Sequence, residues 1–281
     1  MDFCEVTPSP LKRPLLVLFH GLEGSSGSHY SQAFADWGLQ NGCDIAVPHF
    51  RGCSGTLNLA PRAYHSGDHE EVDHLLRKFK QMVDAQNRPG LLAAGVSLGG
   101  NALMRWAGEH GPSAQKIVSA VASVCSPLDL TASGHAIGKG FNRQVYTRMF
   151  LRSMKPKAMA KLKQFPGLFD ANKLMAAKDL YDFDDVFTAP LHGFKNTDDY
   201  WLRASALQHM RCIALPALAL NAKNDPFIPS NSLPTSDKVS AHVKLWQPDG
   251  GGHVGFVSGS LPGHLKAIPQ AVGQWLLRHI H

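Results

Sequence analysis

A single pentapeptide, G-x-S-x-G, stands between an apolar run and a run that favours a helix. Its fixed positions are Gly95, Ser97 and Gly99. Residues 91–94 before it are apolar, and residues 101–106 after it have helix-favouring side chains. A strand, a sharp turn and a helix around a serine lift the serine oxygen above the end of a sheet, and such a turn tolerates little besides glycine at its flanks. The helix begins there, so its free N–H groups and positive dipole end face the oxygen. Ser97 is therefore the candidate nucleophile.

Strand and helix signals alternate along most of the chain. Short continuous apolar runs predict buried parallel strands at residues 14–19, 44–48, 91–96, 117–124, 215–221 and 243–246. Helical periodicity is found between and after them, at residues 30–40, 70–85, 98–109 and 264–279. Repeated β-α units predict an α/β fold, with a mostly parallel sheet and helices on both faces.

The alternation stops between about residues 127 and 212, where helical signals occur without a convincing strand. We expect a helical cap here, placed above Ser97 and inserted into a core made of residues 1–126 and 213–281. Before the first strong strand there is room for one short strand, such as residues 3–7.

The central part of the expected cap is strongly basic. Residues 138–178 hold one acid, Asp170, and ten basic residues, a larger excess than the net charge of +6 of the whole chain. One interpretation is a basic amphipathic lid that contacts an anionic membrane and lines an acyl pocket. The simpler interpretation is a solvated helix face over an ordinary pocket. No fold motif supports binding of nucleic acid.

Composition narrows the class of protein. The chain has 281 residues, 44% of them hydrophobic, enough for one large core. No apolar stretch approaches the ~18–20 residues that cross a bilayer, and no secretory signal is visible. The five cysteines are scattered and form no C-x-x-C pair, which fits free thiols in a reducing compartment. We expect a cytoplasmic protein; its oligomeric state is left open.

Two segments late in the chain supply partners for Ser97. Asp225 follows the expected strand at residues 215–221, where a carboxylate can orient an imidazole. His253 lies in a glycine-rich loop after the last strand, and such a loop can bring it over the serine. The order Ser97, Asp225, His253 is the one that α/β hydrolases use. Asp237, in a polar stretch, and Asp249, close to His253 in sequence, are weaker candidates for the carboxylate.

A glycine-containing loop after the first strong strand predicts part of an oxyanion hole. Residues 20–24 read His-Gly-Leu-Glu-Gly, at the place where a serine hydrolase supplies one backbone N–H donor. We assign that donor to Leu22 and the second donor to Leu98, which follows the nucleophile. His20 is expected to pack or hydrogen-bond within this loop.

Sequence motifs that indicate a metal or cofactor site are either misspaced or absent in this chain. His69 and His74 are five residues apart, whereas H-E-x-x-H requires four, so we expect no metal site. The chain contains neither the G-K-[ST] ending of a phosphate loop nor a nicotinamide-type G-x-G-x-x-G, and we expect no cofactor.

These segments together resemble the YheT-like esterases, a branch of the α/β-hydrolase superfamily also called hydrolase fold family four. The matching segments are residues 18–25, 49–55, 64–68, 95–101, 224–227 and 251–256. In that family the elbow serine, the aspartate before Pro-Phe and the glycine-flanked histidine form the triad, which implies Ser97, Asp225 and His253. Members are carboxylic-ester hydrolases, and some act on lipids or as alcohol acyltransferases. They usually carry a longer N-terminal region than the 13 residues that precede Pro14 here.

The expected function is cleavage of a small-molecule or lipid ester by a serine esterase, through an acyl-enzyme. Two alternatives use the same site: an alcohol O-acyltransferase, and a lipid or thioester acyl hydrolase. An alternative from another class is a catalytically silent, hydrolase-like binding protein.

Overall fold

The computed structural model describes residues 2–4 and 12–280, and within them seven strands form one sheet. The strand order is β1-β3-β2-β4-β5-β6-β7, and each neighbouring pair is parallel except β1 with β3. The bounds are Asp2–Cys4 (β1), Leu15–Phe19 (β2), Asp44–Val47 (β3), Leu91–Val96 (β4), Ala120–Val124 (β5), Ala217–Leu220 (β6) and Val243–Trp246 (β7). The α/β-hydrolase fold with a mostly parallel sheet is confirmed.

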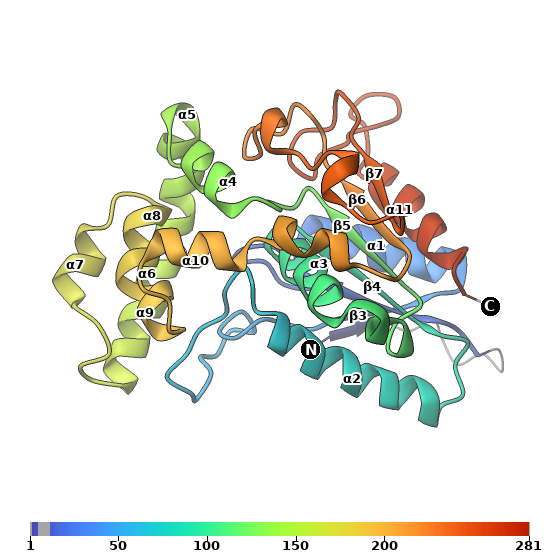
Figure 1. Ribbon diagram of the computed structural model, residues 1–281, viewed down its shortest axis with the longest axis horizontal. Helices are drawn as coiled ribbons and strands as arrows, with labels where there is room; N and C mark the ends of the chain where they lie inside the picture. Colours follow the sequence, from blue (N-terminus) through green and yellow to red (C-terminus); the bar gives the residue numbers. More distant parts are fainter. Residues whose placement is uncertain (1, 5–11, 281) are drawn as a thin grey trace.

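Helices cover both faces of this sheet (Figure 1). Alternate residues of β2 point to opposite faces of the sheet. On one face, Leu16 and Leu18 pack in a buried cluster with side chains from α1 (His29–Asn41) and α11 (Ala267–Leu277). Leu15 and Val17 pack in the other, with α2 (His69–Ala85) and α3 (Leu98–His110). This explains why the central strands read as continuous apolar runs, since both sides of each strand are buried.

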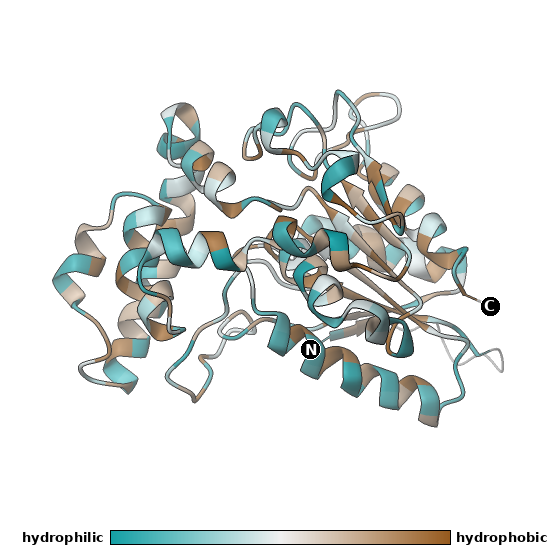
Figure 2. Ribbon diagram, in the orientation of Figure 1, coloured by the Kyte–Doolittle hydropathy of each residue, from teal (hydrophilic) through white to brown (hydrophobic). Residues whose placement is uncertain are grey.

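The amphipathic pattern predicted for residues 70–85 corresponds to α2. Val72, Leu76, Phe79 and Val83 are buried at helical spacing, and the outer side of the helix is largely hydrophilic (Figure 2). Glu70 and Glu71 lie in its first turn, where acidic side chains suit the helix dipole.

Between β5 and β6 the chain forms helices and turns, without a strand. These are α4 (Leu130–Ile137), α5 (Gly140–Asn142), η2 (Arg143–Thr147), α6 (Arg148–Gln164), α7 (Ala171–Ala176), α8 (Leu180–Phe183), η3 (Asp184–Thr188), α9 (Ala189–Leu191), α10 (Thr197–Ala204) and η4 (Ala206–Cys212). Most of them project to one side of the sheet (Figure 1) and have apolar clusters of their own. Ala206 and Met210 of η4 already pack in the core beneath α3. The division at residues 127 and 212 stays a prediction.

Several expected elements differ in their bounds; β6, for example, covers Ala217–Leu220 rather than residues 215–221. β5 begins at Ala120 rather than at residue 117, because the η1 turn (Gly111–Lys116) precedes it. α11 begins at Ala267 rather than at residue 264, because His264 pairs with Ser258 across a turn. β1 is Asp2–Cys4, which begins one residue before the expected residues 3–7 and overlaps them at residues 3 and 4; residues 5–7 lie outside the described part of the chain.

Within residues 2–4 and 12–280, no helix combines the length and the hydropathy that a membrane span requires.

Candidate active site

Ser97 lies at the sharp turn from β4 into α3. Its backbone has φ +52° and ψ −121°, a conformation that a residue with a side chain rarely adopts. The flanking glycines are required by close packing. A Cβ on Gly95 would lie 2.5 Å from Cα of Gly100, and one on Gly99 would lie 2.5 Å from the carbonyl oxygen of Phe19. The start of α3 is thus held directly against β2 and β4, which fixes the place of Ser97 Oγ.

His253 lies between Ser97 and Asp225. Its Nε2 is 3.2 Å from Ser97 Oγ, and its Nδ1 is 2.8 Å from Asp225 Oδ2. The carboxylate of Asp225 is completely buried and also accepts a hydrogen bond of 2.8 Å from the N–H of Phe227. A carboxylate can only accept, so Nδ1 of His253 is the donor and Nε2 is left to accept the proton of the Ser97 hydroxyl.

The loop that carries His253 is tied to the ends of neighbouring strands. Gly252 has φ +62° and donates its N–H to Asn224 Oδ1 at 2.8 Å. Val254 donates its N–H to Cys125 Sγ at 3.4 Å. The ring of Phe227 packs 4.4 Å from the imidazole of His253, between centroids. Backbone and ring contacts therefore fix the histidine on both sides.

The loop after β2 leaves one backbone N–H free. Gly21 donates to the Tyr30 hydroxyl at 2.8 Å, and Glu23 donates to the Tyr64 hydroxyl at 2.9 Å. Leu22, between them, has no hydrogen-bond partner for its N–H among the described residues. The two tyrosines thus satisfy the neighbouring donors and leave the predicted one available.

Leu98 is the first residue of α3, and its N–H makes no hydrogen bond within the described part of the chain. Leu22, Ser97 and Leu98 all line the same cavity. An N–H at a helix start carries the positive end of the helix dipole, so this position suits developing negative charge.

His20 is a structural part of this site. Its Nδ1 is 2.8 Å from the carbonyl oxygen of Gly21, and its Nε2 accepts the N–H of Phe50 at 3.0 Å. Burial lowers the pKa of His20 to about 4, so the ring is neutral at pH 7. It joins the Leu22 loop to the segment after β3 and agrees with the packing role expected for it.

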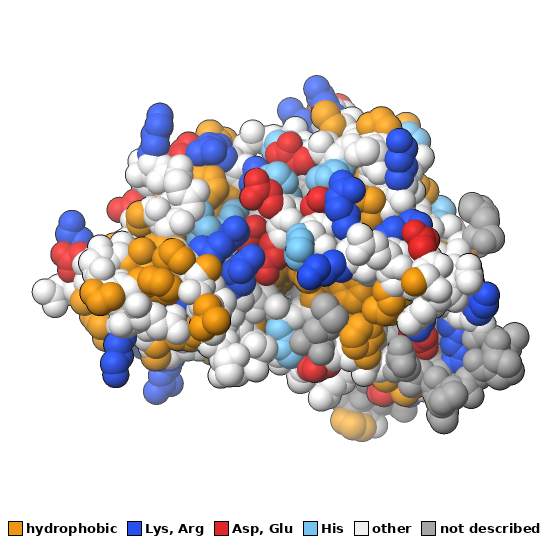
Figure 3. All heavy atoms as spheres, turned by 90° about the horizontal axis from the view of Figure 1, so that it is seen from below, with side chains coloured by type: hydrophobic (Ala, Val, Ile, Leu, Met, Phe, Trp, Pro, Cys, Tyr) orange, Lys and Arg blue, Asp and Glu red, His pale blue; other side chains and the backbone are white. Residues whose placement is uncertain are grey.

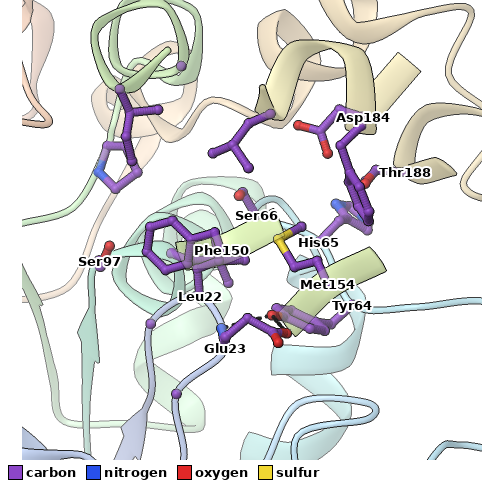
Figure 4. A pocket seen from close by; sticks show the side chains of 18 of the residues that line it. Leu22, Glu23, Tyr64, His65, Ser66, Ser97, Phe150, Met154, Asp184 and Thr188 are labelled. Carbon is purple, nitrogen blue, oxygen red and sulfur yellow. Dashed lines mark hydrogen bonds between the residues drawn. The ribbon is translucent and has the colours of Figure 1, made fainter. Parts of the chain in front are cut away.

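A cavity of about 730 Å³ adjoins Ser97 and His253. Its walls come from the sheet end and from the helices between β5 and β6, and Figure 4 shows Phe150 and Met154 of α6 beside Leu22. Much of the lining is apolar, including Leu22, Ile137, Phe150, Met154, Phe183 and Phe187. This composition suits a hydrocarbon portion of a ligand.

The competing candidates lie elsewhere. Asp237 is exposed in a short 3-10 turn, and Asp249 pairs with Lys223 at 2.8 Å; neither of these two carboxylates lines the cavity. Cys53 lies in one of the segments that carry the family resemblance, but it does not supply a thiolate nucleophile. Burial raises the pKa of Cys53 to about 11, so its thiol is protonated at neutral pH.

The described residues contain no group of three or more His, Cys, Asp or Glu side chains that could hold a metal ion.

Sequence reasoning missed Tyr30, Tyr64 and Asn224. Tyr64 stands in one of the segments that carry the family resemblance, which is a signal for attention but not for a role. Asn224 stands in another of these segments, again without a signal for its role, and Tyr30 had no local signal at all. Each of these two side chains accepts a backbone N–H that only the fold brings close.

Comparison with known proteins identifies the family to which the chain belongs. Residues 14–260 match the family described as "alpha/beta hydrolase fold". The chain is 35% identical over 270 residues to the putative esterase YheT of Escherichia coli, covering 95% of this chain and 78% of that protein. It is 28% identical over 253 residues to the phospholipase ABHD3 of Mus musculus, covering 89% of this chain but only 60% of the phospholipase.

Solved structures share the fold at low identity. The esterase Est1E of Butyrivibrio proteoclasticus, with ferulic acid bound, superimposes with a TM-score of 0.59 at 16% identity, over 99% of this chain and 94% of Est1E. The Pyrococcus furiosus esterase Pf2001 gives a TM-score of 0.55 at 16% identity, over 95% of this chain and 80% of that chain.

Proposed function

The chain belongs to the α/β-hydrolase fold family and to its YheT-like branch, and on that premise we propose that it is a serine hydrolase that cleaves carboxylic esters through an acyl-enzyme. Ser97 is the nucleophile, His253 the general base and acid, and Asp225 the group that orients the imidazole. The N–H groups of Leu22 and Leu98 form the oxyanion hole.

In the acylation step, Ser97 Oγ forms a bond to the ester carbonyl carbon while its proton passes to Nε2 of His253. The carbonyl electron pair moves onto oxygen, and the Leu22 and Leu98 N–H groups stabilise this oxyanion. When the carbonyl re-forms, the bond to the alcohol oxygen breaks. That oxygen takes the proton from Nε2, the alcohol leaves, and the acyl group stays on Ser97.

Deacylation repeats the sequence with water. His253 Nε2 takes a proton as the water oxygen attacks the acyl carbon, and a second oxyanion forms. Its collapse breaks the bond to Ser97 Oγ, which recovers the proton from Nε2, and the acid is released. Throughout, the Asp225 carboxylate stabilises the imidazolium form of His253 by the hydrogen bond at Nδ1.

One observation carries this proposal: a single imidazole lies within hydrogen-bond distance of both the Ser97 hydroxyl and a buried carboxylate. A silent binding protein has no need of that alignment, nor of an unpaired N–H at Leu22. Relatives that are named esterase, phospholipase and monoacylglycerol lipase support ester chemistry. Transfer of the acyl group to an alcohol remains the alternative at the same site, since it differs only in the acceptor.

We also propose that residues 127–212 act as a cap that lines the acyl pocket and faces lipid. Phe141, Val145 and Met149 are four residues apart and exposed, and Met149 also lines the cavity. Arg148 and Arg152 are exposed beside them. Figure 3 draws the molecule from below, the side away from α5 in Figure 1, and hydrophobic side chains gather over the helical insertion on that face as well, with Lys and Arg at the margins. An apolar strip with basic flanks favours the lipid-facing interpretation over a solvated face.

The test of the proposed function is turnover of nitrophenyl esters with graded acyl chains. We expect saturable hydrolysis, with kcat/KM rising toward medium chains because each buried CH₂ adds ~0.8 kcal/mol of binding. A parallel assay with an added alcohol distinguishes hydrolysis from acyl transfer by its product, an acid or a new ester. Absence of turnover over the whole series would favour the silent binding protein. The cytoplasmic location stays a prediction.

A further inference from the structure

The cavity has a polar group of side chains far from Ser97. Figure 4 shows Asp184, Thr188 and His65 on the side of the pocket opposite Ser97, with Leu22 and Phe150 lying between. The mechanism above uses none of these three side chains. Asp184 and Thr188 come from η3 in the helical insertion, whereas His65 comes from the segment before α2.

Asp184 is a carboxylate without a positively charged partner. Its Oδ2 accepts the indole N–H of Trp201 at 2.9 Å, and the Thr188 hydroxyl also hydrogen-bonds to the carboxylate. In the described part of the chain, no Lys, Arg or His forms an ion pair with it. Burial raises the pKa of Asp184 to about 6, so the group is mainly ionised at pH 7. Asp184 is half-buried and lines a largely apolar cavity, where a carboxylate is unfavourable unless further donors reach it.

His65 contributes a donor to the same region. Its Nδ1 accepts the N–H of Gly67 at 3.2 Å, which puts the ring proton on Nε2. Burial lowers the pKa of His65 to about 3, so the ring is neutral. The ring is fixed by His192, with 4.6 Å between centroids, and by Tyr200 at 5.7 Å. No hydrogen bond from Nε2 is found among the described residues.

We propose that this end of the cavity binds a hydroxyl group that the substrate carries away from its scissile ester. The hydroxyl donates its hydrogen to Asp184 and accepts the Nε2–H of His65. A hydroxyl fits because it donates and accepts at once. An ammonium group would satisfy Asp184 but would meet the N–H of His65 with another donor.

The proposal rests on the proposed ester hydrolysis, and it specifies the substrate class: hydroxy-acyl esters or monoesters of diols, depending on which side of the ester occupies the pocket. Either source presents the same hydroxyl to Asp184 and His65.

The experiment compares plain nitrophenyl alkanoates with their ω-hydroxy and ω-ammonium counterparts over a graded chain length. A second arm compares monoesters of diols with the matching alkyl esters. We expect one hydroxyl series to exceed its plain counterpart by about tenfold in kcat/KM at a preferred length, the usual effect of one satisfied hydrogen bond to a charged group. A wild-type enzyme that hydrolyses plain esters without hydroxyl preference in either arm would overturn the proposal. So would a preference for the ammonium series.

The variant Asp184→Asn tests whether Asp184 is the residue that accepts the substrate hydroxyl. Trp201 donates to this side chain, so the asparagine oxygen turns toward the indole and its NH₂ faces the pocket. The substrate hydroxyl then meets two donors, and the preference should fall about tenfold while plain esters are still hydrolysed. The control is Asp185→Asn, an exposed neighbour that accepts the N–H of Thr197 and does not line the cavity. An unchanged preference in Asp184→Asn would contradict the assignment.

A measurement of ligand binding distinguishes failure of the hydroxyl site from failure of the proposed ester hydrolysis. Calorimetric titration of Ser97→Ala with a straight-chain α,ω-diol and with the matching monoalcohol needs no turnover. The diol should bind about tenfold more tightly, and equal affinities would overturn the hydroxyl site whatever the ester assays show.

Discussion

Nε2 of His253 lies 3.2 Å from Oγ of Ser97, although 156 residues separate them in the chain. One partner is held by a strained turn at the end of β4, and the other by a glycine loop after β7. Both lie beyond the carboxyl ends of parallel strands, where ligands bind in open α/β sheets. This juxtaposition suits proton transfer from the serine hydroxyl, and the first two predictions address the groups that maintain it.

Asp225→Asn should lower kcat/KM for a nitrophenyl ester by on the order of 10³–10⁴. The asparagine oxygen keeps the N–H of Phe227, so its NH₂ faces Nδ1 of His253 and favours the wrong tautomer. The melting temperature should change little. The matched control is Asp237→Asn, an exposed carboxylate outside the cavity. If Asp237→Asn proves the more damaging substitution, the choice of carboxylate is wrong.

Gly99→Ala should lower activity by about 10²-fold or more. The added Cβ would lie 2.5 Å from the carbonyl oxygens of both Phe19 and His20, so the start of α3 must move. A displacement near 1 Å at a reacting group has about this effect on the rate. Thermal unfolding should also occur at a lower temperature. At Gly27, a Cβ meets only Ser25 Oγ at 3.5 Å, so Gly27→Ala should behave like wild type. Equal activity of the two variants would contradict the packing argument.

Buried neutral histidines predict acid destabilisation. The pKa values of His20 and His65 are lowered by burial to about 4 and about 3, below the ~6.5 of an unfolded chain. Below pH 6.5 the unfolded state therefore binds more protons than the folded state. As a result, the free energy of unfolding decreases as the pH is lowered. Asp184, with its pKa raised to about 6, opposes this between about pH 4 and 6, because there the folded state binds the extra proton.

Denaturant titrations between pH 7 and pH 5 test the predicted direction of the change in stability. The free energy of unfolding should decrease toward pH 5, and His20→Gln should flatten the decrease. Between pH 6.5 and pH 5 one such histidine contributes about 2 kcal/mol. Replacing the exposed His74 by Gln should leave the slope unchanged. Stability that rises toward pH 5 in the wild type would show that the two histidines are not buried neutral.

The lipid-facing cap predicts binding to anionic vesicles that salt weakens. Each surface Lys or Arg contributes only ~1 kcal/mol and is screened within ~8–10 Å. Met149→Ser, combined with Phe141→Ser, should weaken co-sedimentation at low salt, because both side chains are exposed and Met149 follows the exposed Arg148 in the chain. The control is Leu59→Ser, an exposed apolar residue outside the insertion. Equal sedimentation with neutral and anionic vesicles would support the solvated cover instead.

Local patterns predicted most of the core because each element satisfies its own periodicity. The buried runs of β2 and β4 and the spacing of Val72, Leu76 and Phe79 in α2 are decided within a few residues. The start of α11 was misplaced because His264 is drawn into a bridge with Ser258, a contact that helical periodicity does not register.

The parts of the candidate site that lie in sequence motifs were predictable. Ser97 and His253 have glycine neighbours that indicate unusual backbone, and Asp225 follows a strand. The supporting contacts were not predictable. Tyr64 reaches Glu23 across 41 positions, and the polar end of the cavity combines η3 with the segment before α2. The first contact joins two loops that are distant in the chain, and the second depends on how the helical insertion sits on the sheet; no local pattern encodes either.

The measurement that tests the account most directly is covalent labelling with a fluorophosphonate, followed by mass spectrometry of the labelled peptide. Only a serine activated by a neighbouring base reacts readily with this reagent. We predict one adduct on Ser97 in the wild type. In Ser97→Ala we predict no adduct, an unchanged melting temperature and a loss of on the order of 10³-fold or more in ester hydrolysis. Ser66→Ala, which changes another serine lining the same cavity, should label normally. An unlabelled wild type, or near-full activity in Ser97→Ala, would contradict the proposed mechanism.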